Sequence, residues 1–330
     1  MLRFLKSIFG AGEKKTGFTG SFVKEAVERA VDGTDPCLRV VSGYKRKLKP
    51  SVRLALDYVN ALVDGLPPSR PVGAGIRVND PLVRAFFISE DEMCRVIRND
   101  RNLAGFLRNA ETVPEEISAL LVMEKNETVS FGAEMSGDTV ERDMPRKIIT
   151  FEGHRLLDPS GEDSENRLML KRRAYDHLVS LALGRITTMK TERQGLERRR
   201  ELLQSKLDML RRTGWGFEAS GLADGPDIPG FEEEIGNVGS QLLELGGDDR
   251  IFDEHLDIVI DVLGRPGEHL WGKTETVILD SMGVLRDEAA ANAVELTFHG
   301  LFNSEGRMLV VLPVVLDGAE IRDLKRLPKP

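Results

Sequence analysis

The chain has 330 residues, of which 41% are hydrophobic, and its formal net charge is −8. This apolar fraction is enough for a buried core and excludes wholesale disorder. No apolar run approaches the length of a membrane-spanning helix. Cys37 and Cys94 lie far apart and form no CxxC pair, so we expect free thiols and a cytoplasmic protein.

The charge is unevenly distributed along the chain. From Arg167 to Thr213 there are 13 basic and 5 acidic residues, a net of +8. From Gly214 to the end there are 9 basic and 23 acidic residues, a net of −14. Such asymmetry can mark an arm that binds polyanions. The simpler interpretation is that the basic segment faces the acidic segment of its own chain or of a second copy.

Residues 1–19 are predicted to be an amphipathic or flexible segment. Within residues 1–10, Leu2, Leu5 and Phe9 would share one face of a helix, and Arg3 would lie on the opposite face. Such a helix can rest on a membrane surface and would give a peripheral contact at the inner face of the membrane. The alternative is a short helix that docks on its own domain.

Residues 20–110 are predicted to be helical. Phe22, Ala26 and Ala30 recur at helical spacing. A second apolar stripe begins after Pro50, which favours a helix that starts at this proline.

The region 117–158 changes to the two-residue period of β-strands. Val129 and Phe131 alternate with polar residues, and Lys147–Phe151 is rich in β-branched and aromatic side chains. We therefore predict an antiparallel ribbon here.

A single long helix is predicted for residues 165–213. At 1.5 Å per residue it would reach roughly 70 Å, which is too long for an ordinary compact core to bury. Its apolar residues recur at alternating spacings of three and four, which is the pattern of a coiled-coil seam. The seam residues that we expect to contact a partner are Ile186, Met189, Leu196, Leu203, Leu207 and Leu210.

Four residues weaken this helix as a symmetric coiled coil. Arg193 and Arg200 occupy seam positions, where they would oppose each other unless they reach solvent or meet acids. Gly184 and Gly195 each cost about 1 kcal/mol relative to alanine. We expect the first half of the helix to belong to a domain core and the second half to project as an arm.

Residues 214–330 are predicted to be an acidic region of helices and strands. Two helices are expected, from Phe231 to Leu245 and from Ile251 to Leu263, each followed by glycine. Three later segments predict a three-stranded antiparallel meander: Thr276–Leu285, Ala293–Phe302 and Arg307–Leu316. The expected fold class is therefore α+β and mainly helical, with an antiparallel sheet and one long basic helix of coiled-coil character.

One segment matches the phosphate-binding pattern G-x4-G-K-[ST] through Gly267, Gly272, Lys273 and Thr274. In a functional loop of this kind a strand precedes the glycines and a helix follows them. Here a helix is predicted before the segment and a strand after it. We interpret the segment as a turn into a strand and keep nucleotide binding as an alternative.

No catalytic motif or metal site is predicted. Asp253, His255 and Asp257 would converge on one face of a strand, where they could bind a metal, but on the predicted helix they point in different directions. The remaining histidines have no ligand neighbour at a suitable spacing. We therefore expect no catalytic residues and no cofactor.

Three basic runs, Lys171–Arg173, Arg198–Arg200 and Arg211–Arg212, could neutralise the phosphates of a nucleic acid. Aromatic residues that could stack on bases are scarce in the long helix, where Tyr175 stands alone. The sequence thus favours a non-enzymatic cytoplasmic interaction or scaffolding protein that binds a protein partner or a second copy through the long helix. The alternatives are an enzyme acting on a nucleotide or phosphate compound, and nucleic-acid binding by the basic helix.

Overall fold

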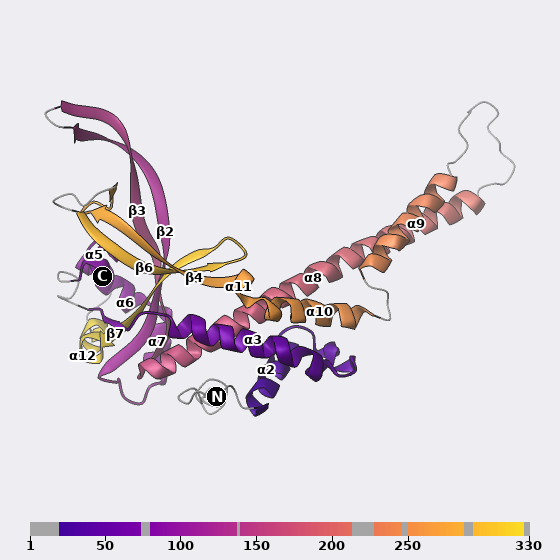
Figure 1. Ribbon diagram of the computed structural model, residues 1–330, viewed down its shortest axis with the longest axis horizontal. Helices are drawn as coiled ribbons and strands as arrows, with labels where there is room; N and C mark the ends of the chain where they lie inside the picture. Colours follow the sequence, from indigo (N-terminus) through magenta and orange to yellow (C-terminus); the bar gives the residue numbers. More distant parts are fainter. Residues whose placement is uncertain are drawn as a thin grey trace. The chain divides into compact units, whose positions relative to one another are not determined.

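The computed structural model describes residues 20–73, 80–136, 139–212, 228–245, 250–286 and 293–326 (Figure 1). Residues 1–19, with the amphipathic segment predicted there, lie outside the described residues. The described chain divides into two compact units. We call them the β-unit, with residues 56–175 and those from 266 onward, and the helical unit, with residues up to 55 and 176–265. Helices α3 (Tyr44–Asp64) and α8 (Asp163–Arg212) contribute to both.

The β-unit is built on a seven-stranded sheet in the order β3-β2-β7-β6-β4-β5, with β1 beside β7. Its strands are β1 (Arg70–Pro71), β2 (Glu116–Ser136), β3 (Thr139–Ser160), β4 (Leu270–Asp280), β5 (Leu285–Arg286), β6 (Ala293–Asn303) and β7 (Met308–Asp317). All neighbours are antiparallel except β1, which pairs in parallel with β7. The Ile149 amide of β3 donates to the carbonyl of Gly283, which lies just before β5, over 2.9 Å. This hydrogen bond joins the β5 end of the sheet to β3, the strand at its other end.

One face of the sheet carries the larger core of the β-unit. Alternation along β2 directs Ile117, Leu121 and Met123 to this face. Four helices contribute side chains to the same core: α5 (Pro81–Phe86), α6 (Glu90–Asn99), α7 (Arg101–Asn109) and α12 (Gly318–Arg326). Phe86 of α5 lies edge-on to Phe151 of β3, with ring centroids 4.7 Å apart.

The other face of the sheet packs against the two long helices. Leu120 and Val122 of β2 lie in a second core with Val63 of α3 and Leu170 of α8. The sheet is therefore covered on both faces, which explains the nearly continuous apolar run at residues 117–123.

The helical unit contains no strand among its described residues. Its elements are α2 (Gly20–Gly33), the 3-10 helix η1 (Pro36–Val40), the first half of α3, α8 from Asp176, α9 (Ile228–Glu244) and α10 (Ile251–Gly264). Its buried apolar residues include Val27, Ala30, Val31, Leu38, Val52, Leu178, Ala182, Leu256, Val259 and Val262. Gly33, at the end of α2, lies so close to α8 that an added Cβ would be 2.7 Å from Cγ1 of Val179.

The predicted fold class is confirmed, including the ribbon, the three-stranded meander and one long helix that continues through Gly184 and Gly195. None of the described helices combines the length and apolar character needed to cross a membrane. The prediction that a helix starts at Pro50 is wrong, because α3 begins at Tyr44. Tyr44 and Lys45 both bind Glu28 of α2, and these contacts favour the earlier start.

The close approach of Gly33 to Val179 gives a stability prediction. Gly33→Ala should destabilise the protein by about 1–3 kcal/mol, because the added methyl forces α2 and α8 apart. Gly184→Ala is the matched control, since nothing lies within 4 Å of an added Cβ there. It should stabilise the helix by about 1 kcal/mol. Chemical denaturation measures both, and equal effects of the two variants would contradict this packing.

Candidate functional site

The predicted seam of α8 is covered by another helix of the same chain. Leu203 lies in a buried cluster with Val238 and Leu242 of α9, and Leu196 packs against it. Of the six predicted seam residues, Ile186, Leu203 and Leu207 are buried, and Met189, Leu196 and Leu210 are half-buried. We call α9 and residues 196–211 of α8 the helical hairpin. The part of the seam that contains Leu196 and Leu203 therefore packs against α9 of the same chain.

Ion pairs accompany the apolar contacts of the helical hairpin. Arg199 Nη2 lies 2.5 Å from Glu234 Oε1, and Arg211 Nη2 lies 2.5 Å from Glu232 Oε1. Exposed pairs of this kind contribute about 0–1 kcal/mol each. They therefore favour one pairing of the helices, while burial of the leucines supplies most of the stability.

The two arginines at seam positions have different environments. Arg193 meets Glu197 within α8, with Nε 2.9 Å from Oε1, and its side chain is 11% exposed. Arg200 is exposed to solvent. Neither therefore presents a bare charge to the leucines of the seam.

A second, exposed set of apolar side chains lies on the helical hairpin. Leu202 is 58% exposed and Met209 is 64% exposed, and their spacing of seven places both on the same side of α8. The exposed Arg198 and Lys206 lie four residues on either side of Leu202 and border it. We call these four residues the basic stripe. The stripe was not predicted from the sequence, because the alternating spacing of three and four drew attention to the leucines of the seam and left Leu202 and Met209 outside it.

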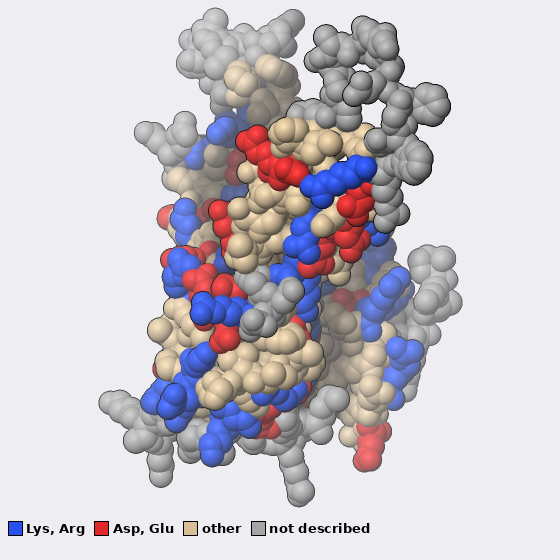
Figure 2. Space-filling view, turned by 90° about the vertical axis from the view of Figure 1, so that its right-hand side faces the viewer, with Lys and Arg blue, Asp and Glu red and all other residues tan. Residues whose placement is uncertain are grey.

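The neighbouring helix presents the opposite charge. Helix α9 contains four glutamates and no basic residue. Leu243 is 73% exposed, and Glu233 and Glu244 are also exposed. In the space-filling view, basic and acidic side chains are interleaved over the visible face and do not form one continuous basic surface (Figure 2).

The G-x4-G-K-[ST] segment lies in regular secondary structure. Gly267 belongs to α11 (Pro266–His269), and Gly272, Lys273 and Thr274 belong to β4, where Lys273 is paired with Gly300 of β6. An added Cβ at Gly267 would be 3.3 Å from Tyr58, and one at Gly272 would be 3.2 Å from Leu62. The glycines therefore allow α3 to approach, and their geometry favours the interpretation as a turn into a strand.

The three polar residues considered as metal ligands lie on α10. Asp253 pairs with Lys47 at 2.9 Å. His255 is fully buried and its Nδ1 lies 3.0 Å from Asp35 Oδ2. Within the described ranges, no group of three or more His, Cys, Asp or Glu side chains is arranged to hold a metal ion.

Asp35 joins three elements of the helical unit. Its Oδ2 accepts from His255 of α10 and from Lys190 Nζ of α8 at 2.8 Å, and its Oδ1 accepts from the Cys37 amide at 3.0 Å. Burial alone would raise the pKa of Asp35, but these donors outweigh it and hold the pKa below its usual value. Burial and the charge of Lys190 lower the pKa of His255, although Asp35 acts in the opposite sense.

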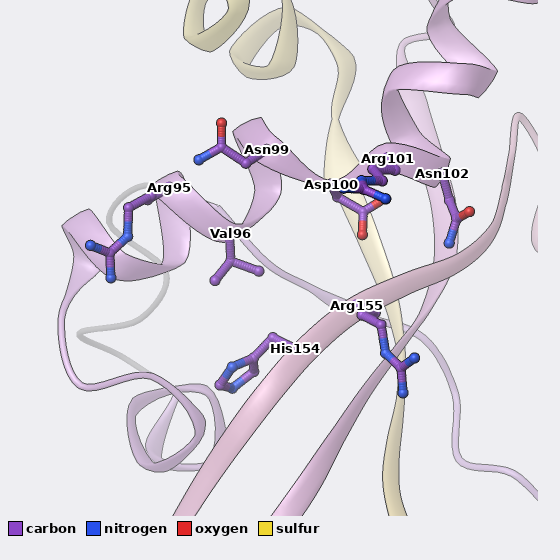
Figure 3. Close-up of a pocket in the computed structure, with 8 residues that line it drawn as sticks. All are labelled: Arg95, Val96, Asn99, Asp100, Arg101, Asn102, His154 and Arg155. Carbon is purple, nitrogen blue, oxygen red and sulfur yellow. The ribbon is translucent and has the colours of Figure 1, made fainter. Parts of the chain in front are cut away.

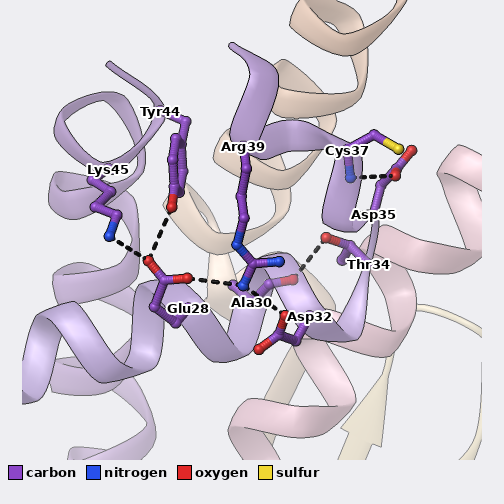
Figure 4. A network of polar contacts seen from close by, with 9 residues as sticks. All are labelled: Glu28, Ala30, Asp32, Thr34, Asp35, Cys37, Arg39, Tyr44 and Lys45. Carbon is purple, nitrogen blue, oxygen red and sulfur yellow. Dashed lines mark hydrogen bonds and ion pairs between the residues drawn. The ribbon is translucent and has the colours of Figure 1, made fainter. Parts of the chain in front are cut away.

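A second polar network, drawn in Figure 4, fixes the corner between α2 and α3. Glu28 accepts from Lys45 Nζ at 2.8 Å, from Arg39 at 2.9 Å and from the Tyr44 hydroxyl at 3.0 Å. These donors, Lys45 foremost, hold the pKa of Glu28 at about 2. The basic residues at the start of α3 thus have structural partners.

Comparison of the chain with protein-family models, with curated proteins and with solved structures finds no match.

The state of His255 gives a pH prediction. Its pKa is lowered on folding, so below about pH 6.5 the unfolded chain binds a proton that the folded chain excludes. The free energy of unfolding should therefore fall by about 1 kcal/mol per pH unit as the pH drops through this range. In the His255→Gln variant, this fall in the free energy of unfolding between pH 7.5 and 5.5 should be lost. Denaturant titrations at pH 7.5 and 5.5 measure it, and an undiminished decline in the variant would contradict the assignment.

Proposed function

We propose that the chain is a non-enzymatic cytoplasmic interaction or scaffolding protein that self-associates through the helical hairpin. The observation that carries this proposal is the basic stripe. Its apolar residues remain exposed although the predicted seam is already covered within the chain. Burying an exposed leucine or methionine is worth roughly 1.5–3 kcal/mol, so the stripe is a favourable surface for association.

Charge complementarity supports a second copy as the partner. The basic stripe has Arg198 and Lys206 at its border, whereas α9 carries the exposed residues Glu233, Leu243 and Glu244. Two copies related by a two-fold axis can place the basic stripe of each against α9 of the other. Opposite charges at the border of such a contact favour this orientation over the contact of two basic stripes.

The alternatives receive less support. Several cations of the basic runs already have partners: Lys171 with Asp64, Arg173 with Asp158, Arg199 with Glu234 and Arg211 with Glu232. Nucleotide binding at Lys273 would have to occur on a paired strand. Contact of residues 1–10 with a membrane surface stays a prediction.

The self-association surface can be tested by mutation. Leu202→Asp together with Met209→Asp should convert the oligomer into monomers in sedimentation equilibrium. These side chains are exposed within the chain, so the free energy of unfolding of the monomer should change little. Leu183→Asp is the control, because Leu183 is an exposed leucine of the same helix outside the helical hairpin. It should leave the association unchanged.

A charge exchange tests the orientation of the two copies. One variant carries Arg198→Glu and Lys206→Glu, and the other carries Glu233→Lys and Glu244→Lys. Each alone should associate weakly, and an equimolar mixture should recover the association because opposite charges again face each other. A wild-type protein that is monomeric at high concentration, or a mixture that shows no recovery, would contradict the proposal.

Pairing within the chain also predicts weak binding of nucleic acid. Labelled DNA and RNA should bind weakly at low salt and not detectably near physiological salt, where charges are screened beyond about 8 Å. Binding that persists at physiological salt and is lost when Arg198, Arg199 and Arg200 are changed to glutamate would instead make nucleic acid the preferred ligand.

A further inference from the structure

A basic cavity lies in the β-unit, and no residue considered above for self-association lines it. Its volume is about 620 Å³, within the range of small-molecule sites. It lies where α6 meets α7, against β3 (Figure 3). The residues that line it are Arg95, Val96, Asn99, Asp100, Arg101, Asn102, His154 and Arg155.

The cavity brings together three positive charges that form no ion pair among the described residues. Among the described residues, Arg95, Arg101 and Arg155 make no ion pair with a carboxylate. Some arginines of the β-unit are paired, as Arg70 is with Asp80 and Arg286 with Asp280, whereas others outside the cavity, such as Arg108, are in no ion pair among the described residues. What sets Arg95, Arg101 and Arg155 apart is that all three line one cavity, in a chain of net charge −8.

The single acidic residue that lines the cavity is engaged with the backbone. Asp100 Oδ1 accepts from the Leu103 amide at 2.8 Å, which caps α7. Its Oδ2 accepts from the Leu156 amide of β3 at 2.9 Å. Both oxygens therefore hold the fold together, and the carboxylate only partly offsets the three guanidinium charges.

The same contacts make the frame of the cavity rigid. Asn102 Nδ2 donates to the Leu156 carbonyl at 2.6 Å, so side chains from the start of α7 bind both backbone groups of Leu156. This fixes the helix junction against β3 and with it the backbones of Arg101 and Arg155. A site whose frame is held in advance loses less entropy when a ligand binds.

His154 lines the cavity with an uncharged imidazole ring. Its ring stacks on Phe87 with centroids 4.6 Å apart, and its Nε2 lies 2.7 Å from the Phe86 carbonyl. Burial lowers the pKa of His154, although nearby Glu92 and Glu152 act in the opposite sense. The neutral ring donates from Nε2 to this carbonyl and, with Val96, gives the cavity an apolar side.

We propose that this cavity binds a small phosphate-bearing anion through Arg95, Arg101 and Arg155. A guanidinium group donates two parallel hydrogen bonds to phosphate oxygens, which is the geometry that favours arginine over lysine for this class of ligand. Three such groups suit a ligand with at least two negative charges. The apolar side formed by Val96 and His154 accommodates its uncharged part.

The proposal is tested by calorimetric titration of the full-length protein with pyrophosphate at constant ionic strength. Citrate in a parallel titration distinguishes phosphate from carboxylate recognition. We expect saturable binding of pyrophosphate that is tighter than that of citrate. Arg101→Gln together with Arg155→Gln should weaken it about tenfold to a hundredfold or more, because each charge-assisted hydrogen bond contributes roughly 1.5–3 kcal/mol. Both arginines are exposed, so the variant should keep its unfolding temperature in the absence of ligand.

Arg108→Gln is the matched control, because Arg108 is an exposed arginine of α7 that does not line the cavity. It should bind pyrophosphate like the wild-type protein. The proposal is overturned if wild-type protein fails to bind pyrophosphate, if citrate binds as tightly, or if Arg108→Gln weakens binding as much as the double variant. It is also overturned if the double variant binds normally.

Discussion

The long helix α8 must cover its apolar seam, because a helix of 50 residues cannot leave a row of leucines in water. Near the start of α8, Leu170 packs against the sheet in the smaller core of the β-unit. Further along, Leu178 and Ala182 are buried within the helical unit. In its last part, Leu203 packs against Val238 and Leu242 of α9.

Charged groups have two different roles in this structure, depending on whether they are exposed or buried. The exposed pairs between α8 and α9 add little free energy each, yet they match the basic helix with an acidic one. The Asp35 contact is different because Asp35 and His255 are buried. Removing one member of such a group leaves another uncompensated in the interior, which is far more costly than the loss of an exposed pair. Elements η1, α8 and α10 are therefore held in place at this point.

Much of the fold could be predicted from the sequence, because its periodicities are long and regular. The alternation near Val129 and Phe131 and the three-four spacing of α8 each identified an element. The start of α3 could not be predicted, because it depends on contacts of Tyr44 and Lys45 with Glu28 on another helix. A proline at position 50 gave a stronger local signal that tertiary packing overrode.

The candidate sites were harder to predict than the fold. The seam residues of α8 were recognisable, but whether α9 or a second copy covers them depends on the path of the chain and not on their spacing. The basic cavity left no sequence signal, since Arg95 and Arg101 line the same cavity as Arg155 only when β3 lies against the α6–α7 junction. No motif links residues that come together in this way.

The central claim is that the seam of α8 is covered by α9 of the same chain, and a distance measurement tests it most directly. Spin labels at Ser205 and Ser240, in a protein without Cys37 and Cys94, are placed on exposed positions of the two helices. The labelled chain is mixed with a large excess of unlabelled chain, and pulsed electron resonance measures the separation. Packed helices lie roughly 8–10 Å apart, so a label distance below about 30 Å should persist after dilution. A short distance that disappears on dilution would mean that α9 of a second copy covers the seam.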